Sequence, residues 1–203
     1  MFLLLLCEKP DLLCCLRHKI CWGIPKIRKM GIVILLLVAA LLIMVVVYVS
    51  GADGKNRTTV SSLDLPRYMG VWYEIARYDH PFERGLERVQ AQYELRPNGR
   101  VGVLNSGTDF RTGRRKQAHG KARASRLPGR LRVSFFWIFY SDYTIRELAD
   151  DYGWALVGGS SPKFLWILSR TPVLPSRTLN HILRLAEQRG YRTDKLLFVE
   201  QAG

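Results

Sequence analysis

Residues 70–85 read GVWYEIARYDHPFERG, and this stretch decides which kind of fold the chain forms. Side chains along a strand alternate between its two faces. A period of two therefore gives two sets: Trp72, Glu74, Ala76 and Tyr78 on one face, and Tyr73, Ile75 and Arg77 on the other. A half-buried strand ordinarily has one apolar and one polar face, whereas both faces are mixed here. The stretch fits either a catalytic segment with Glu74 and His80 as acid and base, or a strand whose faces have two structural roles.

The composition favours an anionic partner. Lys and Arg total 31 against 17 Asp and Glu, a formal net charge of +14, which suits nucleic acid, acidic ligands or anionic lipid surfaces. All four cysteines lie within the first 21 residues, and their spacing does not match a zinc pattern such as paired C-x2-C. The rest of the chain needs no disulfide or thiol chemistry, and we expect neither a metal site nor a cofactor.

Residues 32–49, IVILLLVAALLIMVVVYV, carry no charge. A helix of this length spans about 27 Å, close to the hydrocarbon thickness of a bilayer. A buried helix of a soluble protein is rarely apolar all round over such a length. The run therefore predicts a transmembrane helix or signal anchor.

The residues around this run predict its orientation. Residues 1–31 hold six basic side chains against two acidic ones, so the positive-inside tendency keeps this segment in the cytoplasm and exports the rest. Small residues after the run also suit cleavage as a signal peptide, and a translation start at Met30 would remove the basic flank. Residues 50–62 are small and polar and predict a flexible linker before a folded domain at 63–203.

The exported domain shows short alternating runs separated by turn residues, among them Pro97-Asn98-Gly99, Pro128-Gly129 and Ser141-Asp142. Eight candidate strands lie near 70–78, 88–95, 100–108, 116–125, 130–136, 143–149, 154–158 and 164–169. Eight sequential strands joined by hairpin turns predict an all-β up-and-down barrel or a sandwich.

One helix is expected after these strands. Following Pro175, apolar residues recur at helical spacing and form a single stripe: Leu179, Ile182, Leu183 and Ala186. Gly190 suits the end of this helix, and residues 195–200 suit a short last strand. The stripe must be buried, and the outside of a barrel is the surface available to it.

The alternation also indicates what the barrel contains. The inward sets mix alanine and glycine with aromatic residues, and eight strands enclose a space wide enough for one small ligand when part of the wall is small. A ligand cavity is therefore the expectation, with a fully packed core as the alternative.

Three segments resemble the signature blocks of the lipocalin family, and they contain five matching residues: Gly70 and Trp72 on the first strand, Asp151-Tyr152 before the seventh, and Arg170 after the eighth. The stretches GVWYEIARYDHPFERGLERVQAQYELRPNG, VSFFWIFY and FLWILSRTP are similar to the bacterial lipocalins, outer-membrane lipoproteins that also resemble apolipoprotein D. The similarity covers about residues 63–201. It implies an eight-stranded antiparallel barrel with a C-terminal α-helix packed outside.

The resemblance also implies a function. It implies a periplasmic or cell-envelope protein that binds fatty acids or lysophospholipids for lipid storage or transport. Trp72 would close the barrel floor with Arg170 stacked across it, an arrangement that gains cation–π energy. Two departures stand out. An apolar helix takes the place of the relatives' processed cysteine anchor, and Asp150 stands where Thr is usual.

Strand parity and the resemblance together predict an apolar tunnel with tyrosine hydroxyls, suited to an acyl chain with a polar end. The residues predicted to line it are Ala76, Tyr78, Val89, Ala91, Tyr93, Val103, Leu131, Val133, Phe135, Ala155, Val157, Trp166 and Leu168. Each of these positions also fits a simple core. Glu74 falls on the same face and is the least explained residue of the opening stretch.

Catalysis and nucleic-acid binding fit the sequence less well than ligand binding, and we expect no enzymatic activity. Glu74 and His80 are six residues apart on a strand and its following turn, and the sequence has no G-x-S-x-G or H-E-x-x-H motif. Nucleic-acid binding fits the charge, but an exported barrel without a basic aromatic stacking face argues against it. A structural envelope protein with a filled barrel is the serious competitor.

A basic run and a bulky apolar loop are predicted to lie on the surface of the domain. Residues 111–132 carry nine Lys or Arg and no acid. Parity places four of them, Lys121, Arg123, Arg130 and Arg132, on the outer wall, where they favour an anionic membrane surface or headgroups near the mouth. Trp137-Ile138 adds bulk after the fifth strand. Such a loop suits contact with a membrane or with a second subunit, so a homodimer is one expected assembly.

Overall fold

The structure is a computed structural model that describes residues 32–44 and 58–201. The chain divides into two compact units, Met1–Val49 and Ser50–Gly203, each described by itself. In the first unit, residues 32–44 form a helix. Among the described residues, no helix has both the length and the apolar character needed to cross a membrane.

Much of the predicted anchor region lies outside the described residues. This holds for residues 1–31, for residues 45–49 of the apolar run, and for residues 50–57 of the linker. Their predicted roles stay predictions. The described end of the linker lies against the barrel: the Val60 amide donates to the carbonyl of Ile145 (3.2 Å).

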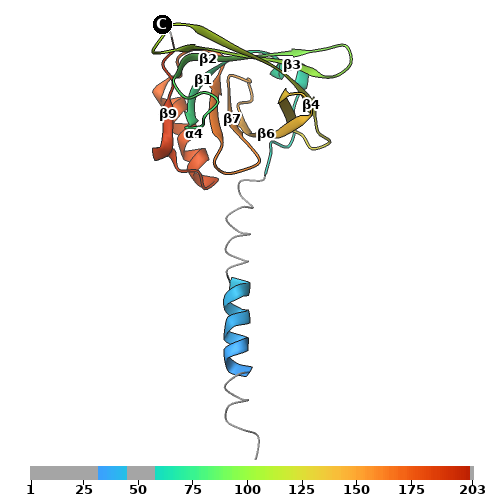
Figure 1. Ribbon diagram of the computed structural model, residues 1–203, viewed down its shortest axis with the longest axis vertical. Helices are drawn as coiled ribbons and strands as arrows, with labels where there is room; N and C mark the ends of the chain where they lie inside the picture. Colours follow the sequence, from blue (N-terminus) through green and yellow to red (C-terminus); the bar gives the residue numbers. More distant parts are fainter. Residues whose placement is uncertain (1–31, 45–57, 202–203) are drawn as a thin grey trace, which may run out of the picture. The chain divides into compact units, whose positions relative to one another are not determined.

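The second unit is a closed antiparallel β-barrel with a helix outside it (Figure 1). The predicted fold class is confirmed for this domain. Its elements are α3 (Leu65–Tyr68), β1 (Gly70–Tyr78), β2 (Leu86–Leu95), β3 (Val101–Asp109), β4 (Arg115–Ala124), β5 (Arg130–Phe136), β6 (Phe139–Leu148), β7 (Trp154–Gly158), β8 (Leu165–Ser169), α4 (Ser176–Gln188), η1 (Thr193–Lys195) and β9 (Leu196–Phe198).

Strand β1 closes the barrel. Its first half pairs with β2, with Gly70 opposite Tyr93, and its second half pairs with β8, with Arg77 opposite Trp166. The short strand β9 lies beside the last residues of β1, so that β2 and β9 share one edge of that strand. All pairs are antiparallel, as expected for strands joined by hairpins.

The barrel has two different ends. Each strand runs opposite to its neighbours, so the connections after β1, β3, β5 and β7 lie at one end, here called the mouth. The start of β1 and the end of β8 lie at the other end, here called the floor. Helix α3 lies at the floor, where the carboxylate of Asp64 accepts a hydrogen bond from the Arg67 amide (3.1 Å) and caps the helix.

Helix α4 covers part of the outer wall. Ile182 and Ala186 are fully buried in one cluster with Ile75 and Ile167 of the barrel, which confirms the predicted stripe and its target. The chain turns at Gly190, whose φ of +83° lies in the left-handed region that favours glycine.

Strand β6 begins earlier than the sequence indicates. The Ser141-Asp142 pair suggests a turn, but both residues lie within β6, and the hairpin turn is formed by Trp137 and Ile138. Asp142 lies opposite Arg132 and forms an ion pair with Arg130 (2.7 Å). Only Asp142 lies on the solvated outer face, because Ser141 lies opposite Val133, which packs against the interior core. A polar pair in the sequence can therefore lie within a strand.

Candidate functional site: the barrel interior

The floor is held by Trp72 and Arg170, as the family resemblance implies. The indole of Trp72 is fully buried and its Nε1 donates to the carbonyl of Tyr68 (2.9 Å). The Arg170 guanidinium lies 3.8 Å from the centre of the Trp72 ring, and it donates to the carbonyls of Val71 and Met69 (both 2.8 Å). One cation thus ties the start of β1 to the end of β8.

The other signature residues complete this floor. Gly70 has a φ of +96°, and a side chain there would crowd the Arg170 guanidinium. The Asp151 carboxylate accepts from the Gly153 amide (2.8 Å) and stabilises the turn between β6 and β7. The Tyr152 hydroxyl accepts from the Asp64 amide (2.9 Å) and joins that turn to the segment before α3.

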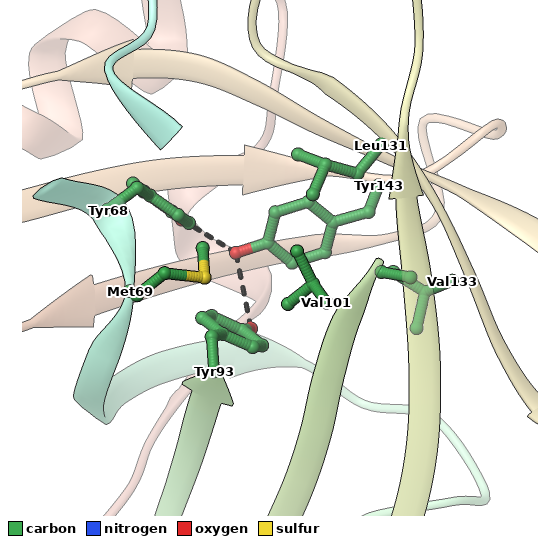
Figure 2. A pocket seen from close by; sticks show the side chains of 8 residues that line it. Tyr68, Met69, Tyr93, Val101, Leu131, Val133 and Tyr143 are labelled. Atoms are coloured by element: carbon green, nitrogen blue, oxygen red, sulfur yellow. Dashed lines mark hydrogen bonds between the residues drawn. The ribbon is translucent and has the colours of Figure 1, made fainter. Parts of the chain in front are cut away.

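Three tyrosine hydroxyls meet just above the floor (Figure 2). The Tyr68 and Tyr143 oxygens are 2.7 Å apart, and the Tyr93 hydroxyl donates to Tyr143 (3.3 Å). Burial raises the pKa of Tyr68 and Tyr143 well above the usual range, and it raises the pKa of Tyr93 to about 12. This tyrosine trio is neutral at physiological pH and can both donate and accept hydrogen bonds.

Most of the predicted lining residues face the interior. Val103, Leu131, Ala155, Val157 and Leu168 belong to its buried core. Tyr93, Val133 and Trp166 pack against that core. Ala91 lies opposite Trp72 on the neighbouring strand and therefore shares its face.

Two of the predicted lining residues, Val89 and Phe135, lie nearer the mouth, and they differ in how far they are buried. Val89 is buried at the irregularity between Glu87 and Gln90, close to Gly107. Phe135 is 37 % exposed, and its ring lies so close to Gly120 that a side chain at position 120 would collide with it.

Ala76 and Tyr78 do not line the interior. The register of β1 against β8 shifts between Glu74 and Ala76, and such a bulge reverses the alternation beyond it. Both residues instead lie in the cluster beneath α4, where the Tyr78 hydroxyl donates to the carbonyl of Arg192 (3.1 Å). The parity prediction is wrong for these two residues. It is also wrong for Arg77, which pairs with the inward Trp166.

A buried polar cluster lies beneath the β1–β2 loop and is here called the mouth cluster: Glu74, Arg77, His80, Glu83 and Trp166. Arg77 Nη1 donates to Glu74 Oε1 and its Nη2 to the carbonyl of Glu83 (both 2.7 Å). His80 Nε2 lies 3.0 Å from Glu83 Oε2, and the Trp166 indole donates to the same oxygen (3.1 Å). Glu74 thus has a partner that the sequence did not reveal.

The two carboxyl groups of the mouth cluster differ in proton affinity. Burial raises the pKa of Glu74 well above its usual range; the nearby Glu83 adds to the rise, and Arg77 acts against it without cancelling it. Burial also acts to raise the pKa of Glu83, but contact with His80, Trp166 and Arg77 outweighs burial and lowers it. Opposite shifts of this kind occur at catalytic sites and in structural ion-pair networks. Arg77 joins Glu74 on β1 to the carbonyl of Glu83 in the β1–β2 loop, an arrangement that fits a structural ion-pair network.

The interior is narrow near the floor and more open toward the mouth. The space beside the tyrosine trio is about 10 Å³, about the room of one water molecule. Farther up, Asn105 lies opposite both Ala91 and Ala118. Ala91 is half-exposed and Ala118 is exposed, so the small side chains of this upper wall face solvent.

Sequence reasoning missed Tyr68, Tyr143, Arg77 and Glu83. Tyr68 precedes the first predicted strand, and Tyr143 stood at the assumed start of the sixth. The register gives the signal that could have placed Tyr143, because it lies opposite the inward Leu131. Among residues 32–44 and 58–201, no group of His, Cys, Asp and Glu is arranged to hold a metal ion.

The tyrosine trio predicts loss of stability in alkali. Because the pKa values are raised in the folded state, the folded chain keeps protons that the unfolded chain releases near pH 10. The stabilising contribution is complete below about pH 10 and is lost as pH rises through the folded values, about 12 for Tyr93. We expect the urea midpoint to fall between about pH 9 and about pH 11.

Two variants separate this effect from general alkaline damage. Tyr143→Phe removes the shared hydroxyl and should weaken the pH dependence, whereas Tyr140→Phe removes a hydroxyl elsewhere on β6 and should leave it as in the native chain. Equal pH dependence in Tyr143→Phe and the native chain would contradict this account.

Comparison with known proteins identifies the family. Residues 63–201 match the model of the lipocalin-like domain. The chain is 44% identical over 148 residues to the outer membrane lipoprotein Blc of Escherichia coli, covering 72% of this chain and 84% of that protein. It is 42% identical to Blc of Vibrio cholerae over 70% and 85% of the two chains. It is 30% identical to mouse apolipoprotein D over 70% and 78%.

Solved structures agree on the fold. Insecticyanin from the tobacco hornworm Manduca sexta matches with a TM-score of 0.61 at 18% identity, covering 71% of this chain and 84% of that one. Lobster apocrustacyanin A1 matches with a TM-score of 0.59 at 18% identity, covering 69% and 81%. From the signature residues at the floor, the matched domain and these relatives, we conclude that the chain belongs to the lipocalin family.

Proposed function

We propose that this lipocalin holds a single-chain amphiphile, a fatty acid or a lysophospholipid, for lipid storage or transport in maintenance of the cell envelope. Family membership implies a binding protein for a hydrophobic ligand, and the bacterial relatives are named as outer membrane lipoproteins. The observation that carries the proposal is that one interior combines an apolar wall with tyrosine hydroxyls and an ionic cluster.

The polar and apolar parts of the interior suit the two parts of an amphiphile. An acyl chain can lie against Val103, Leu131 and Val157. Arg77 Nε and Asn105 Oδ1 are buried and lack a hydrogen-bond partner among the described residues. Leaving such an atom unsatisfied costs about 1–3 kcal/mol. A ligand carboxylate or phosphate can accept from Arg77, and a glycerol hydroxyl can donate to Asn105.

We propose binding without catalysis. Glu74 is engaged by Arg77, and His80 lies beside Glu83 within 5.3 Å of the Trp166 ring centre. Among the described residues, neither Glu74 nor His80 forms a hydrogen bond with the hydroxyl or thiol of a serine, threonine or cysteine, as the base of an activated nucleophile would. The proposed ligand chemistry needs no cofactor.

One observation favours the alternative of a filled barrel without a ligand. The space beside the tyrosine trio holds about 10 Å³, so an acyl chain reaches that depth only if side chains there move apart. Binding confined to the open upper wall needs less rearrangement. The two proposals therefore differ in whether the chain takes up lipid at all.

Lysophospholipid titration of Ala91→Trp tests the ligand proposal. An indole at position 91 projects into the space in front of Trp72, where it displaces the acyl chain. We expect the native chain to show a saturable change in tryptophan emission and the variant to lose at least about 10-fold in affinity, as for a ligand shut out of its pocket. Isothermal calorimetry provides the second readout.

Gln92→Trp is the matched control for that experiment. Gln92 is the next residue on β2 and is exposed, so its indole points away from the interior. We expect unchanged affinity and a fold that is intact in both variants by circular dichroism. Equal uptake by the Ala91 and Gln92 variants would refute the assignment of the interior face, and no uptake by the native chain would favour the filled barrel.

We further propose that residues 32–49 tether the chain in a membrane with residues 1–31 in the cytoplasm and the domain at 63–203 exported, linked by residues 50–62. The apolar run and its basic flank support this arrangement. Protease treatment of intact spheroplasts should digest the domain and leave the basic segment protected. A mature chain that begins after residue 50 would instead support a cleaved signal peptide.

A further inference from the structure

Exposed aromatic side chains gather at the mouth of the barrel. Six large apolar residues are here called the mouth rim: Phe82, Phe110, Phe136, Trp137, Ile138 and Phe139. Their exposed fractions run from 59 % at Phe110 to 84 % at Trp137. They lie in or beside the connections after β1, β3 and β5, which the strand order brings to one end. Among the described residues of the floor connections, no exposed large apolar side chain is aromatic.

The tip of the β5–β6 hairpin is unusual for a turn. Phe136 lies opposite Phe139, so Trp137 and Ile138 form a two-residue turn. Two-residue hairpin turns favour glycine or asparagine at the first position, because that residue needs a positive φ. Trp137 adopts a φ of +44°, which costs a residue with a side chain roughly 1 kcal/mol. Both side chains are exposed. The packing of this domain therefore gives no compensation for placing them there.

Basic residues accompany the mouth rim. The β3–β4 connection and its flanks, residues 109–116, carry four basic side chains and one acid. The acid, Asp109, is occupied by Lys116 (2.7 Å). Arg111 and Arg114 are exposed and have no acidic partner among the described residues. The result is an apolar tip with uncompensated positive charge beside it.

From this arrangement we infer that the mouth rim docks onto the surface of a lipid bilayer that contains anionic lipids. Aromatic side chains favour the interface between headgroups and acyl chains, and each basic residue near an anionic surface strengthens binding about five-fold. An exposed apolar patch of this kind marks an interaction site. The barrel mouth then opens directly onto the lipid, which gives the proposed ligand a dry route. Only this last step rests on the proposed function.

The charge argues against a second copy of the chain as the partner. Two rims facing each other would bring the unpaired Arg111 and Arg114 of both copies together, and like charges across an interface are unfavourable. An anionic bilayer meets the apolar and the basic residues at once, because its headgroups and acyl chains complement the two parts.

The test uses the emission of Trp137 in the full chain. The chain is incorporated into vesicles of phosphatidylcholine, with or without phosphatidylglycerol, in which the acyl chains are brominated. The spectrum of Trp137→Phe is subtracted from that of the native chain, which isolates Trp137. We expect at least two-fold quenching of Trp137 in the anionic vesicles. This measurement reports the rim even if residues 32–49 hold the chain in both kinds of vesicle.

Two controls make the result specific. Trp154 packs against His181 on α4, with ring centres 6.0 Å apart, so the difference spectrum of Trp154→Phe should show no quenching. The double variant R111E/R114E reverses two charges and should reduce quenching toward the level in phosphatidylcholine alone. No quenching of Trp137 in anionic vesicles would overturn the inference. So would a cross-link from position 137 to a second copy in place of quenching.

The ligand proposal and the docking proposal fail separately. Uptake of lysophospholipid by a chain whose Trp137 is never quenched would overturn docking alone. Quenching of Trp137 in a chain that takes up no lipid would support docking and overturn the ligand proposal alone.

Discussion

Replacing Trp72 with alanine is expected to destabilise the barrel by about 3–5 kcal/mol, the usual cost of removing a buried Trp or Phe side chain. The indole is fully buried, so its loss leaves a cavity at the floor. It also leaves the Arg170 guanidinium without the ring 3.8 Å away, while its hydrogen bonds to Val71 and Met69 remain. Urea unfolding followed by far-ultraviolet circular dichroism gives the change in free energy.

Trp154→Ala is the control for that measurement. Trp154 is half-buried against α4, so its loss should cost about 1–2 kcal/mol from the smaller apolar area removed from water. A Trp72→Ala variant no less stable than Trp154→Ala would show that the floor pairing does not hold the barrel together.

The second large effect is expected from Arg77→Met. Arg77 is 4 % exposed and bridges Glu74 to the β1–β2 loop. Removing one partner of a buried ion pair leaves the other charge uncompensated, at a cost of about 3–5 kcal/mol. We expect this loss in the free energy of unfolding at neutral pH, measured in urea.

The pH dependence of that variant follows from Glu74. The pKa of Glu74 is raised in the folded state, so its contribution is present below the unfolded pKa and is lost as pH rises through the folded pKa. Without Arg77 the rise is larger, and the deficit should therefore shrink as pH falls from about 7 toward about 5. The double variant E74Q/R77M should regain most of the stability at neutral pH. A deficit independent of pH would contradict a buried carboxylate as its cause.

The sequence predicts the barrel well because turns and alternation are local properties. The strands at 70–78, 130–136 and 154–158 have the predicted bounds. Gly99 and Gly129 both adopt positive φ in the turns that the sequence indicated. Each of these signals lies within a few residues of the feature that it specifies.

The candidate site is harder to predict, because its residues depend on where the inward–outward alternation of side chains along β1 is interrupted. The bulge between Glu74 and Ala76 turns Arg77 toward Trp166 and moves Tyr78 beneath α4. A bulge has no signature in the chain itself, because it is set by pairing with β8. Only the tertiary structure shows that Glu74 and Glu83 share one cluster.

The family resemblance predicts the residues that close the floor, whereas only the structure reveals the tyrosine trio above them. Trp72 and Arg170 follow from the family blocks, and the stacked geometry is confirmed. The tyrosine trio joins α3, β2 and β6. Parity could include Tyr93 but not Tyr68, because Tyr68 lies in a single helical turn before the first strand.

The most direct test of the ligand proposal is mass spectrometry of lipid extracted from purified chain. Native, Ala91→Trp and Gln92→Trp chains are purified identically, so that lipid carried by residues 32–49 is common to all three. We predict about one single-chain lipid per native chain and per Gln92→Trp chain, and little in Ala91→Trp, as expected for one ligand in an eight-stranded barrel. The same lipid content in all three would contradict a ligand held inside the barrel.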